Sequence, residues 1–591
     1  MAIVPLAKVT LYGPAAEKEA VLEGLQRLGC LHLVDLHPGA ARGPDAARAG
    51  QRAREALQYL EDSPVRRREP ERPAAVDVEG LVREALEVRD RAHALAEERE
   101  QLRARAAELE PWGDFELAGW ARDGALRFSF HVVPLYNLAL LAAVDAPWRI
   151  VGRDHRFAYV VVVAPEPPPG MPGAPVALDP RSLSTVRARL EHVERELEEL
   201  DYRRIGLTLH ASALRAALDA ADDRAAREQA ARATLERDEV LAVQGWAPRD
   251  RVAALRQYAT DRRLAITVAE PGLGEAPPTL LANPPALRGG EALVNFYRTP
   301  GYHMWDPSKA VFLSFVAFFG MILSDAAYGA VLGLGTLLAW RRLGRAAGGA
   351  RGLLAALAIS SVVYGVLVGS YFGWVPPRGS LLAKAHLLDA EDQGVMMLIS
   401  IGIGVAHLSA ANLTSAWRRR RSLAALAPLG WTVVLLAGFW VGVARAHPGA
   451  VRLGLGGVGL GLALVLLFSS EHPVSFAPRA LVSRLLEGLK GITEVSKVFG
   501  DVLSYLRLFA LGLAAIKLAE AFNSLAASSF ALRGVGILLG IVVLVAGHAI
   551  NLAMGILGGV VHGLRLNVIE FFNWSLPVEG EPYRAFTRKA A

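Results

Sequence analysis

The chain has 591 residues, of which 52% are hydrophobic and 21% are charged, and it is too long for one compact domain. Its formal net charge of +6 is modest and is not gathered in one long basic tail, which argues against a nucleic-acid-binding protein. The single cysteine, Cys30, excludes a disulfide framework and any metal or cluster site built from cysteines.

The charged residues divide the chain into two unlike halves. The 64 basic and 58 acidic residues make 122, and 37 of these follow Trp305, which leaves 85 before it. We therefore expect a soluble first half and a membrane-embedded second half. The N-terminus, MAIVPLAKVTLYG, lacks the basic segment, apolar core and cleavage site of a signal peptide, so we expect the first half to be cytoplasmic.

The soluble half alternates between α/β texture and long helices. Residues 3–36 predict strand, helix and strand, and residues 116–165 end in FAYVVVVAP, which is typical of a buried strand. Between and after them, helical stretches run from about 78 to 110 and from 180 to about 239. The segment VLAVQGWAP and a helix plus strand at 249–269 would complete the first lobe.

These patterns predict an α+β half made of two small α/β lobes joined by a long antiparallel helical hairpin. We expect a soluble region over 1–305, with a proximal lobe at 1–42 plus 240–280, a helical arm at 43–112 and 180–239, and a distal lobe at 113–179. The arm can also be a solvated coiled coil that acts only as a stiff spacer.

The second half, 306–591, predicts an all-α polytopic membrane domain of about eight helices. The apolar stretches lie at about 310–323, 327–340, 353–372, 394–416, 423–444, 451–469, 500–529 and 536–572. The first two are short and could form one helix, but eight spans put all three basic loops (341–351, 418–421 and 479–497) on the same side as the N-terminus. The positive-inside preference therefore favours eight spans with both termini cytoplasmic.

The last two spans are expected to be long, antiparallel and tilted. The first of them is expected to begin near Leu481 and to continue to about Ser528, and the second covers 536 to about 573. Both exceed the roughly 20 residues that cross a bilayer, and overlong apolar helices tilt.

Each of these two spans carries an arginine. Arg507 stands in the middle of LSYLRLFALGLAAIKLAEAF (503–522), and Arg565 lies in GGVVHGLRLNVIEFF. A guanidinium stays protonated, and within a bilayer it costs on the order of 3 kcal/mol. Snorkelling to the surface accounts for Arg565 better than for Arg507, so we interpret Arg507 as functional.

No carboxylate in the sequence is an obvious fixed partner for both arginines, since Glu494 lies several turns before Arg507. Such an arginine suits a transient partner: a carboxylic acid that arrives protonated, ionises beside the guanidinium and then leaves. Unequal access of water to the two sides would make that cycle directional.

Five segments resemble subunit a, called subunit I in bacteria, of the V/A-type rotary ATPases. SYLRLFALGLA and HGLRL resemble the two arginine motifs, and FFGMILSDAAYG resembles the first-span motif FFGxxxGDxGYG. TPGYHMWDPS resembles the segment that leads into the membrane, and GWAP resembles GWxP near the end of the soluble half. The segments keep the family's order along most of the chain.

The resemblance implies a stator in the plasma membrane that is no enzyme by itself. Its partners would be a proteolipid ring bearing carboxylates, peripheral stalk subunits of the E/G type on the soluble lobes, and the central-stalk cap subunit of the membrane sector. Arg507 and Arg565 would meet the ring carboxylate between two ion half-channels. Glu494 would be a half-channel group, and Asp325 would match the aspartate of the first span.

The chain departs from the family pattern at several positions. Ser324 and Ala327 replace glycines, Ala515 stands where eukaryotic relatives have a histidine, and Gly555 stands where they have a glutamate. Half-channel roles at those positions do not carry over. Chemically suitable substitutes are Asp501, His548, His562 and Glu570. Asp325 can instead be a helix cap, and Glu494 a surface charge at a helix end.

Other classes of protein explain less of the chain. A secondary transporter would have buried charges but would usually show paired broken helices in related repeats, and it needs no arm. A membrane-tethered coiled-coil scaffold would explain the arm but not Arg507. The sequence has no GxxxxGK[ST] loop, so nucleotide chemistry would belong to partner subunits. We expect no cofactor and no metal ion.

Overall fold

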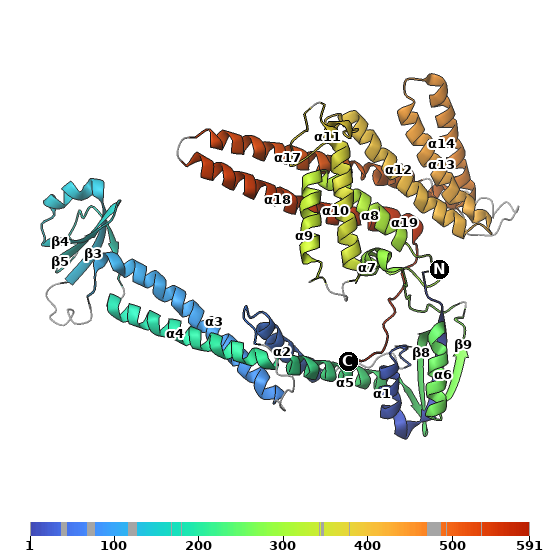
Figure 1. Cartoon of the computed structure of the whole chain (residues 1–591), viewed down its shortest axis with the longest axis horizontal. Helices are drawn as coiled ribbons and strands as arrows, with labels where there is room; N and C mark the ends of the chain where they lie inside the picture. Colours follow the sequence, from blue (N-terminus) through green and yellow to red (C-terminus); the bar gives the residue numbers. More distant parts are fainter. Residues whose placement is uncertain are drawn as a thin grey trace. The chain divides into compact units, whose positions relative to one another are not determined.

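The structure is a computed structural model that describes residues 2–36, 44–67, 77–115, 127–166, 168–178, 180–272, 274–341, 343, 348–377, 379–469, 486–491, 493–532 and 535–589. The chain forms two compact units. The first comprises 1–12, 30–34 and 244–585, and the second comprises 13–29, 35–243 and 586–591. The fold class is as expected: α/β sheets in the N-terminal region are followed by apolar helices (Figure 1).

An antiparallel sheet joins the start of the chain to residues after 234. Its strands are β1 (Leu6–Pro14), β2 (His32–Leu33), β7 (Leu235–Arg237), β8 (Val240–Pro248) and β9 (Ala265–Ala269), in the order β2-β8-β1-β9 with β7 paired to β8. Helices α1 (Lys18–Leu28) and α6 (Val252–Asp261) precede β2 and β9. A Cβ at Gly245 would lie 2.5 Å from the His32 carbonyl oxygen, so only glycine lets these strands approach so closely.

The helical arm consists of α2 (Pro44–Glu61), α3 (Val78–Leu109), α4 (Leu183–Leu207) and α5 (Ala211–Ala233). Figure 1 shows α3 and α4 running side by side. Leu95, Leu102 and Leu109 recur every seven residues on α3 and pack with Val186 and Val193 of α4. This seven-residue spacing is that of a coiled-coil seam.

The return leg of the arm differs from the expected continuous helix over 180–239. A 3-10 turn at Thr208–His210 separates α4 from α5. The Thr208 hydroxyl donates to the Ile205 carbonyl and accepts from the Arg67 amide. The helix ends at Ala233, because Thr234 is extended and β7 follows.

A second antiparallel sheet lies at the end of the α3–α4 hairpin (Figure 1). Its strands are β3 (Arg127–Pro134), β4 (Trp148–Arg153), β5 (Phe157–Ala164) and β6 (Ala174–Val176), in the order β4-β5-β3-β6. Val160 and Val162 alternate along β5 and are fully buried, with Val133 and Leu141 beside them. The predicted strand FAYVVVVAP therefore forms β5, one of the two inner strands of the sheet.

Six of the described helices are long and apolar enough to cross a membrane, and two more are shorter. The membrane-length segments contain α10 (Gly348–Val368), α12 (Gln393–Arg418), α13 (Leu426–Val443), α14 (Pro448–Phe468), α16 (Val495–Leu503) with α17 (Leu506–Phe530), and α18 (Gly536–Arg565) with α19 (Phe572–Ser575). The shorter helices are α8 (Ser308–Leu323) and α9 (Ala326–Ala339). The predicted helix start near Leu481 lies outside the described residues.

Helices α8 and α9 are two helices and not one. Ser324 between them adopts a left-handed conformation with φ of 49°, which ends α8. Both pack against α10. Glycines of α9 approach it closely: Gly329 meets Ser361 and Val362, and Gly333 meets Ala358. Because higher numbers on α9 meet lower numbers on α10, these two helices run antiparallel.

Helices α17 and α18 form a long antiparallel pair (Figure 1). Gly540 lies against Phe530, Gly547 lies against Phe522, and the Asn551 side chain donates to the Ala515 carbonyl. Higher residue numbers on α18 therefore meet lower residue numbers on α17, so the two helices run antiparallel. Their tilt against a membrane stays a prediction.

Candidate functional site

Arg507 lies one residue after the start of α17, beside a break in the helix. Helix α16 ends at Leu503, and Ser504 and Tyr505 form a turn before α17 begins. The Arg507 side chain is partly buried, and its Nη1 atom is buried without a hydrogen-bond partner. None of the ion pairs between described residues includes Arg507. The guanidinium thus keeps its charge without a fixed counter-ion in this part of the chain.

Arg565 is the last residue of α18 and is exposed. The contacts of Phe522 with Gly547 and of Ala515 with Asn551 set the register of the pair. Extending that register puts Arg507 opposite residues 559–562, about one to two turns before Arg565. The two guanidiniums lie within electrostatic range of each other, which concentrates positive charge at this level.

Among the described residues, the Glu570 carboxylate comes near both arginines. It lies in a π-helical turn, Leu566–Phe571, that directly follows Arg565, and it is 2% exposed. Its carboxyl interacts with the Ser504 hydroxyl and lies within electrostatic range of Arg507 and Arg565, but its Oε2 atom accepts no hydrogen bond. No ion pair within 4.0 Å joins it to a described cation.

The remaining candidates near the arginines have different surroundings. Asp501 accepts a hydrogen bond of 2.8 Å from the Trp574 indole. His562 lies within electrostatic range of both arginines, and its Nδ1 atom is buried without a partner. Glu494 is exposed at the start of α16, as expected for a charge at a helix end. The fold thus brings His562 and Glu570 to the arginines and leaves Glu494 at a distance along the helix.

Asp325 has the geometry of a helix cap. One of its carboxylate oxygens accepts from the Tyr328 amide at 3.0 Å, and the other accepts from the Ser370 hydroxyl at 2.6 Å and the Gly373 amide at 3.1 Å. The side chain is 2% exposed. Asp325 therefore caps α9, and its hydrogen bonds to Ser370 and Gly373 join the loop after α10 to the start of α9.

His548 belongs to a chain of hydrogen bonds inside the apolar helices. Its Nε2 atom meets the Asn523 side chain at 3.0 Å, and its Nδ1 atom meets the Tyr328 hydroxyl at 2.6 Å. Asn551 donates to that hydroxyl at 3.1 Å and to the Ala515 carbonyl at 2.8 Å. Sequence reasoning selected His548 but missed the other three side chains, although an asparagine within an apolar helix is itself a signal.

Known proteins resemble the chain along nearly its whole length. No family model matches the chain. It is 29% identical over 611 residues to V-type ATP synthase subunit I 1 of Treponema pallidum, covering 97% of each chain. It is 26% identical to V-type ATP synthase subunit I of Chlamydia pneumoniae, over 90% of this chain and 87% of that one. The chain is therefore similar, over nearly its whole length, to subunit I of V-type ATP synthases.

An archaeal member of the subunit I family and a solved structure also match. The A-type ATP synthase subunit I of Methanocaldococcus jannaschii is 27% identical over 386 residues, which are 59% of this chain and 55% of that one. A crystal structure of the cytoplasmic N-terminal domain of subunit I, a homologue of subunit a of V-ATPase, covers 44% of this chain and 99% of that domain, with 20% identity and a TM-score of 0.22.

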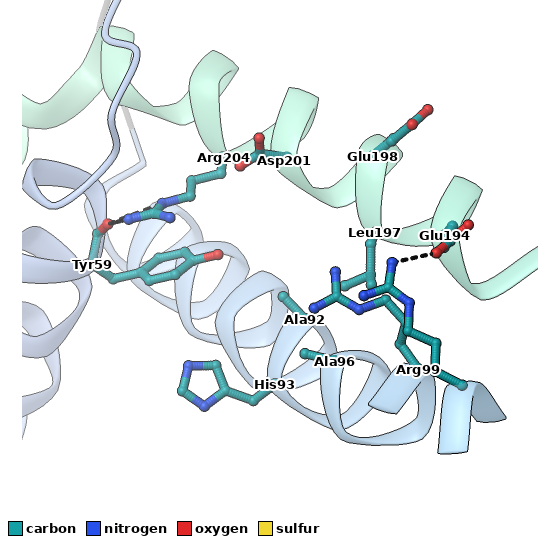
Figure 2. A pocket seen from close by; sticks show the side chains of 11 residues that line it. Tyr59, Ala92, His93, Ala96, Arg99, Glu194, Leu197, Glu198, Asp201 and Arg204 are labelled. Atoms are coloured by element: carbon teal, nitrogen blue, oxygen red, sulfur yellow. Dashed lines mark hydrogen bonds and ion pairs between the residues drawn. The ribbon is translucent and has the colours of Figure 1, made fainter. Parts of the chain in front are cut away.

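A groove of about 550 Å³ lies in the arm of the present chain, between α2, α3 and α4. It is far along the sequence from Arg507 and Arg565. Figure 2 shows Arg204 beside Tyr59, with its hydrogen bond to the Tyr59 carbonyl. The guanidinium lies over the Tyr59 ring, 4.2 Å from its centroid. Acidic and basic side chains both line the groove: His93, Arg99, Arg103, Glu194, Glu198 and Asp201. The contact fastens α2 to α4.

The described residues of the present chain contain no group of three or more histidine, cysteine, aspartate or glutamate side chains that could hold a metal ion.

Proposed function

We propose that the chain is the stator subunit of a rotary ATPase and that its arginines meet the carboxylates of a rotating proteolipid ring. One observation carries the proposal: Arg507 holds a permanent charge among apolar helices, with Nη1 buried and unbonded and no ion pair among the described residues. A guanidinium in that position favours the ionised form of any carboxyl that approaches it. Arg565 adds to the same positive potential.

The polar groups on either side of Arg507 suit two ion half-channels. Along α16 and α17, the contacts of Asp501 and Ser504 come before the arginine. The contacts of Ala515 and Asn523 come after it. An ion that entered along one group would reach the ring carboxylate at Arg507 and leave along the other, so the arginine would separate the two paths.

Glu570 is compatible with a ring carboxylate as the partner of Arg507. It lies near the arginines but forms no ion pair with either among the described residues. We assign it, with Asp501 and His562, to the half-channel on the side of α16. Asp325 is assigned a structural role because its hydrogen bonds are all made within the protein.

The soluble half would hold the peripheral stalks from the cytoplasm. A coiled-coil arm resists bending, as a stator must. In the distal sheet, the 3-10 segment between β3 and β4 has exposed apolar side chains: Tyr136 is 85% exposed and Leu140 is 57% exposed. Such side chains suit a protein partner.

Replacing Arg507 by alanine or lysine tests the proposal. We expect the purified complex to assemble and to lose ATP-coupled ion transport, because neither side chain offers the planar guanidinium. Lys517→Ala is the matched control: Lys517 lies on the same helix, but it pairs with Glu391 and Glu520, so transport should persist. Normal pumping by both Arg507 variants would refute the mechanism.

A further inference from the structure

Four consecutive arginines, Arg418–Arg421, occupy the turn between two membrane-length helices. Helix α12 ends at Arg418, and the next membrane-length segment begins at Leu423. A connection this short cannot carry its side chains far from the ends of the helices. All four arginines are exposed, so their guanidiniums lie at the level where lipid headgroups begin.

Two of the four arginines donate hydrogen bonds to backbone carbonyls. Arg418, in the last turn of α12, donates to the His303 carbonyl at 3.4 Å and also suits the negative end of the helix dipole. Arg420 donates to the Trp417 carbonyl at 3.1 Å. No ion pair between described residues includes any of the four.

Trp417 completes the surface. It is 69% exposed, and the Arg420 guanidinium lies over its ring, 4.7 Å from the centroid. An indole at this position marks the interface between hydrocarbon and headgroups. The ring and the Trp417 carbonyl together restrict the guanidinium, and its remaining N–H groups can donate to an oxyanion such as a phosphate.

We propose that Trp417 and Arg419–Arg421 form a binding site for the headgroup phosphate of an anionic phospholipid. The cations have no protein counter-ion in the described part of the chain, the ring fixes one of them, and the phosphate of a lipid in the adjacent leaflet is at their level. A positive-inside signal needs only the charges. It does not require a guanidinium that lies over an indole ring and hydrogen-bonds to the neighbouring carbonyl, as that of Arg420 does.

Native mass spectrometry of the purified full complex tests this site. The probe is dioctanoyl phosphatidylglycerol, compared with dioctanoyl phosphatidylcholine and with inorganic phosphate at the same concentration. We expect phosphatidylglycerol to bind and the other two not to bind. In R419Q/R420Q/R421Q the affinity should fall about 100-fold, since each basic residue near a membrane surface contributes about fivefold.

Two further variants separate lipid binding from charge and topology. R445Q/R452Q removes two exposed arginines at the other end of α13 and α14 and should leave binding unchanged. R419K/R420K/R421K keeps the charges that orient the protein and should bind less than the wild type but more than the glutamine variant, because lysine lacks the planar fork. Undiminished phosphatidylglycerol binding by the glutamine variant would overturn the proposal. So would equal binding of inorganic phosphate, or an acidic segment of another subunit seated on these arginines in the complex.

Discussion

The hydroxyl of Tyr505 lies 2.8 Å from Nδ1 of His407, a residue 98 positions earlier on α12. Tyr505 is fully buried, and the His407 ring stacks on Phe571 at 4.4 Å with an interplanar angle of 9°. Tyr505, in the turn before Arg507, is therefore bound to His407 of α12. His407 in turn packs on Phe571, which lies in the π-helical turn. The arginine's position depends on three separate segments.

Close packing at this contact predicts a strong effect of a small substitution. A Cβ added at Gly404 would lie 2.7 Å from the Tyr505 ring, so Gly404→Ala should lower stability by about 1–3 kcal/mol and reduce transport. Gly456→Ala on α14 is the matched control, because nothing lies within 4 Å of its added Cβ. Thermal unfolding in detergent measures both. Equal melting temperatures would contradict the close packing.

Substitutions of Asp325 test whether this residue acts as a helix cap or as a half-channel group. Asp325→Ala leaves the Tyr328 and Gly373 amides and the Ser370 hydroxyl without their acceptor, at a cost of about 2–4 kcal/mol. Asp325→Asn keeps one acceptor oxygen and should lie between the alanine variant and the wild type in thermal stability. If the asparagine variant instead unfolds like the wild type and has lost only transport, the carboxylate acts in the ion path.

The hydrogen-bond chain around His548 should matter for transport and not only for stability. His548→Leu keeps the volume but breaks the link between Asn523 and Tyr328. We expect assembled complex with at least tenfold slower ATP-driven ion uptake into vesicles. Leu538→Ala, an exposed residue of the same helix, serves as the control and should pump normally. Rapid uptake by His548→Leu would remove the chain from the ion path.

Ion pairs between α3 and α4 predict how the arm responds to acid. The hydrogen bonds of Arg189 lower the pKa of Glu98, and that of Arg91 lowers the pKa of Glu196. Because the folded pKa lies below the unfolded one of about 4.3, this stabilisation is complete above pH 5 and is lost as the pH falls through the folded pKa. Hydrogen exchange of arm amides, corrected for intrinsic rates, should show less protection at pH 3.5 than at pH 6. E98Q/E196Q should reduce that difference, and an unchanged difference would contradict the assignment.

Cys30 reports on the chain's C-terminal segment. It is 7% exposed, burial raises the pKa of its thiol, and the Tyr583 hydroxyl donates to its carbonyl at 2.8 Å. Slow reaction with a maleimide is expected in the wild type. Tyr583→Ala should speed labelling more than tenfold, because it removes the ring that lies beside His32, whereas Tyr583→Phe keeps that ring and should label slowly. Similar rates for both variants would contradict this arrangement.

The architecture could be predicted where the chemistry repeats along the chain. The seam of Leu95, Leu102 and Leu109 and the alternation along β5 are visible in sequence, because each depends on a local period. The expected continuous helix to residue 239 was wrong, since a side-chain hydrogen bond at Thr208 and an extended Thr234 interrupt it. Those interactions carry no periodic signal.

The candidate site was predictable only in part. Arg507 is conspicuous in one dimension, because a permanent charge within an apolar run has an unavoidable desolvation cost. Its surroundings are not conspicuous in the sequence: His407 is 100 residues away from Arg507, and Glu570 lies in a π-helical turn after Arg565 that no periodic pattern predicts. The asparagines at 523 and 551 gain a meaning only when His548 and Tyr328 join them.

The sequence by itself determined which residues carry charge into apolar helices, which stretches form those helices, and which family the chain resembles. Composition, hydropathy and short motifs are properties of neighbouring residues, and they persist whatever the chain does in space. Only the tertiary structure decided that Asp325 caps a helix and that Tyr505 hydrogen-bonds to His407. It also decided that Glu570 lies near Arg507 without forming an ion pair with it among the described residues. These outcomes depend on distances between helices, which follow from packing against partners far away in the chain.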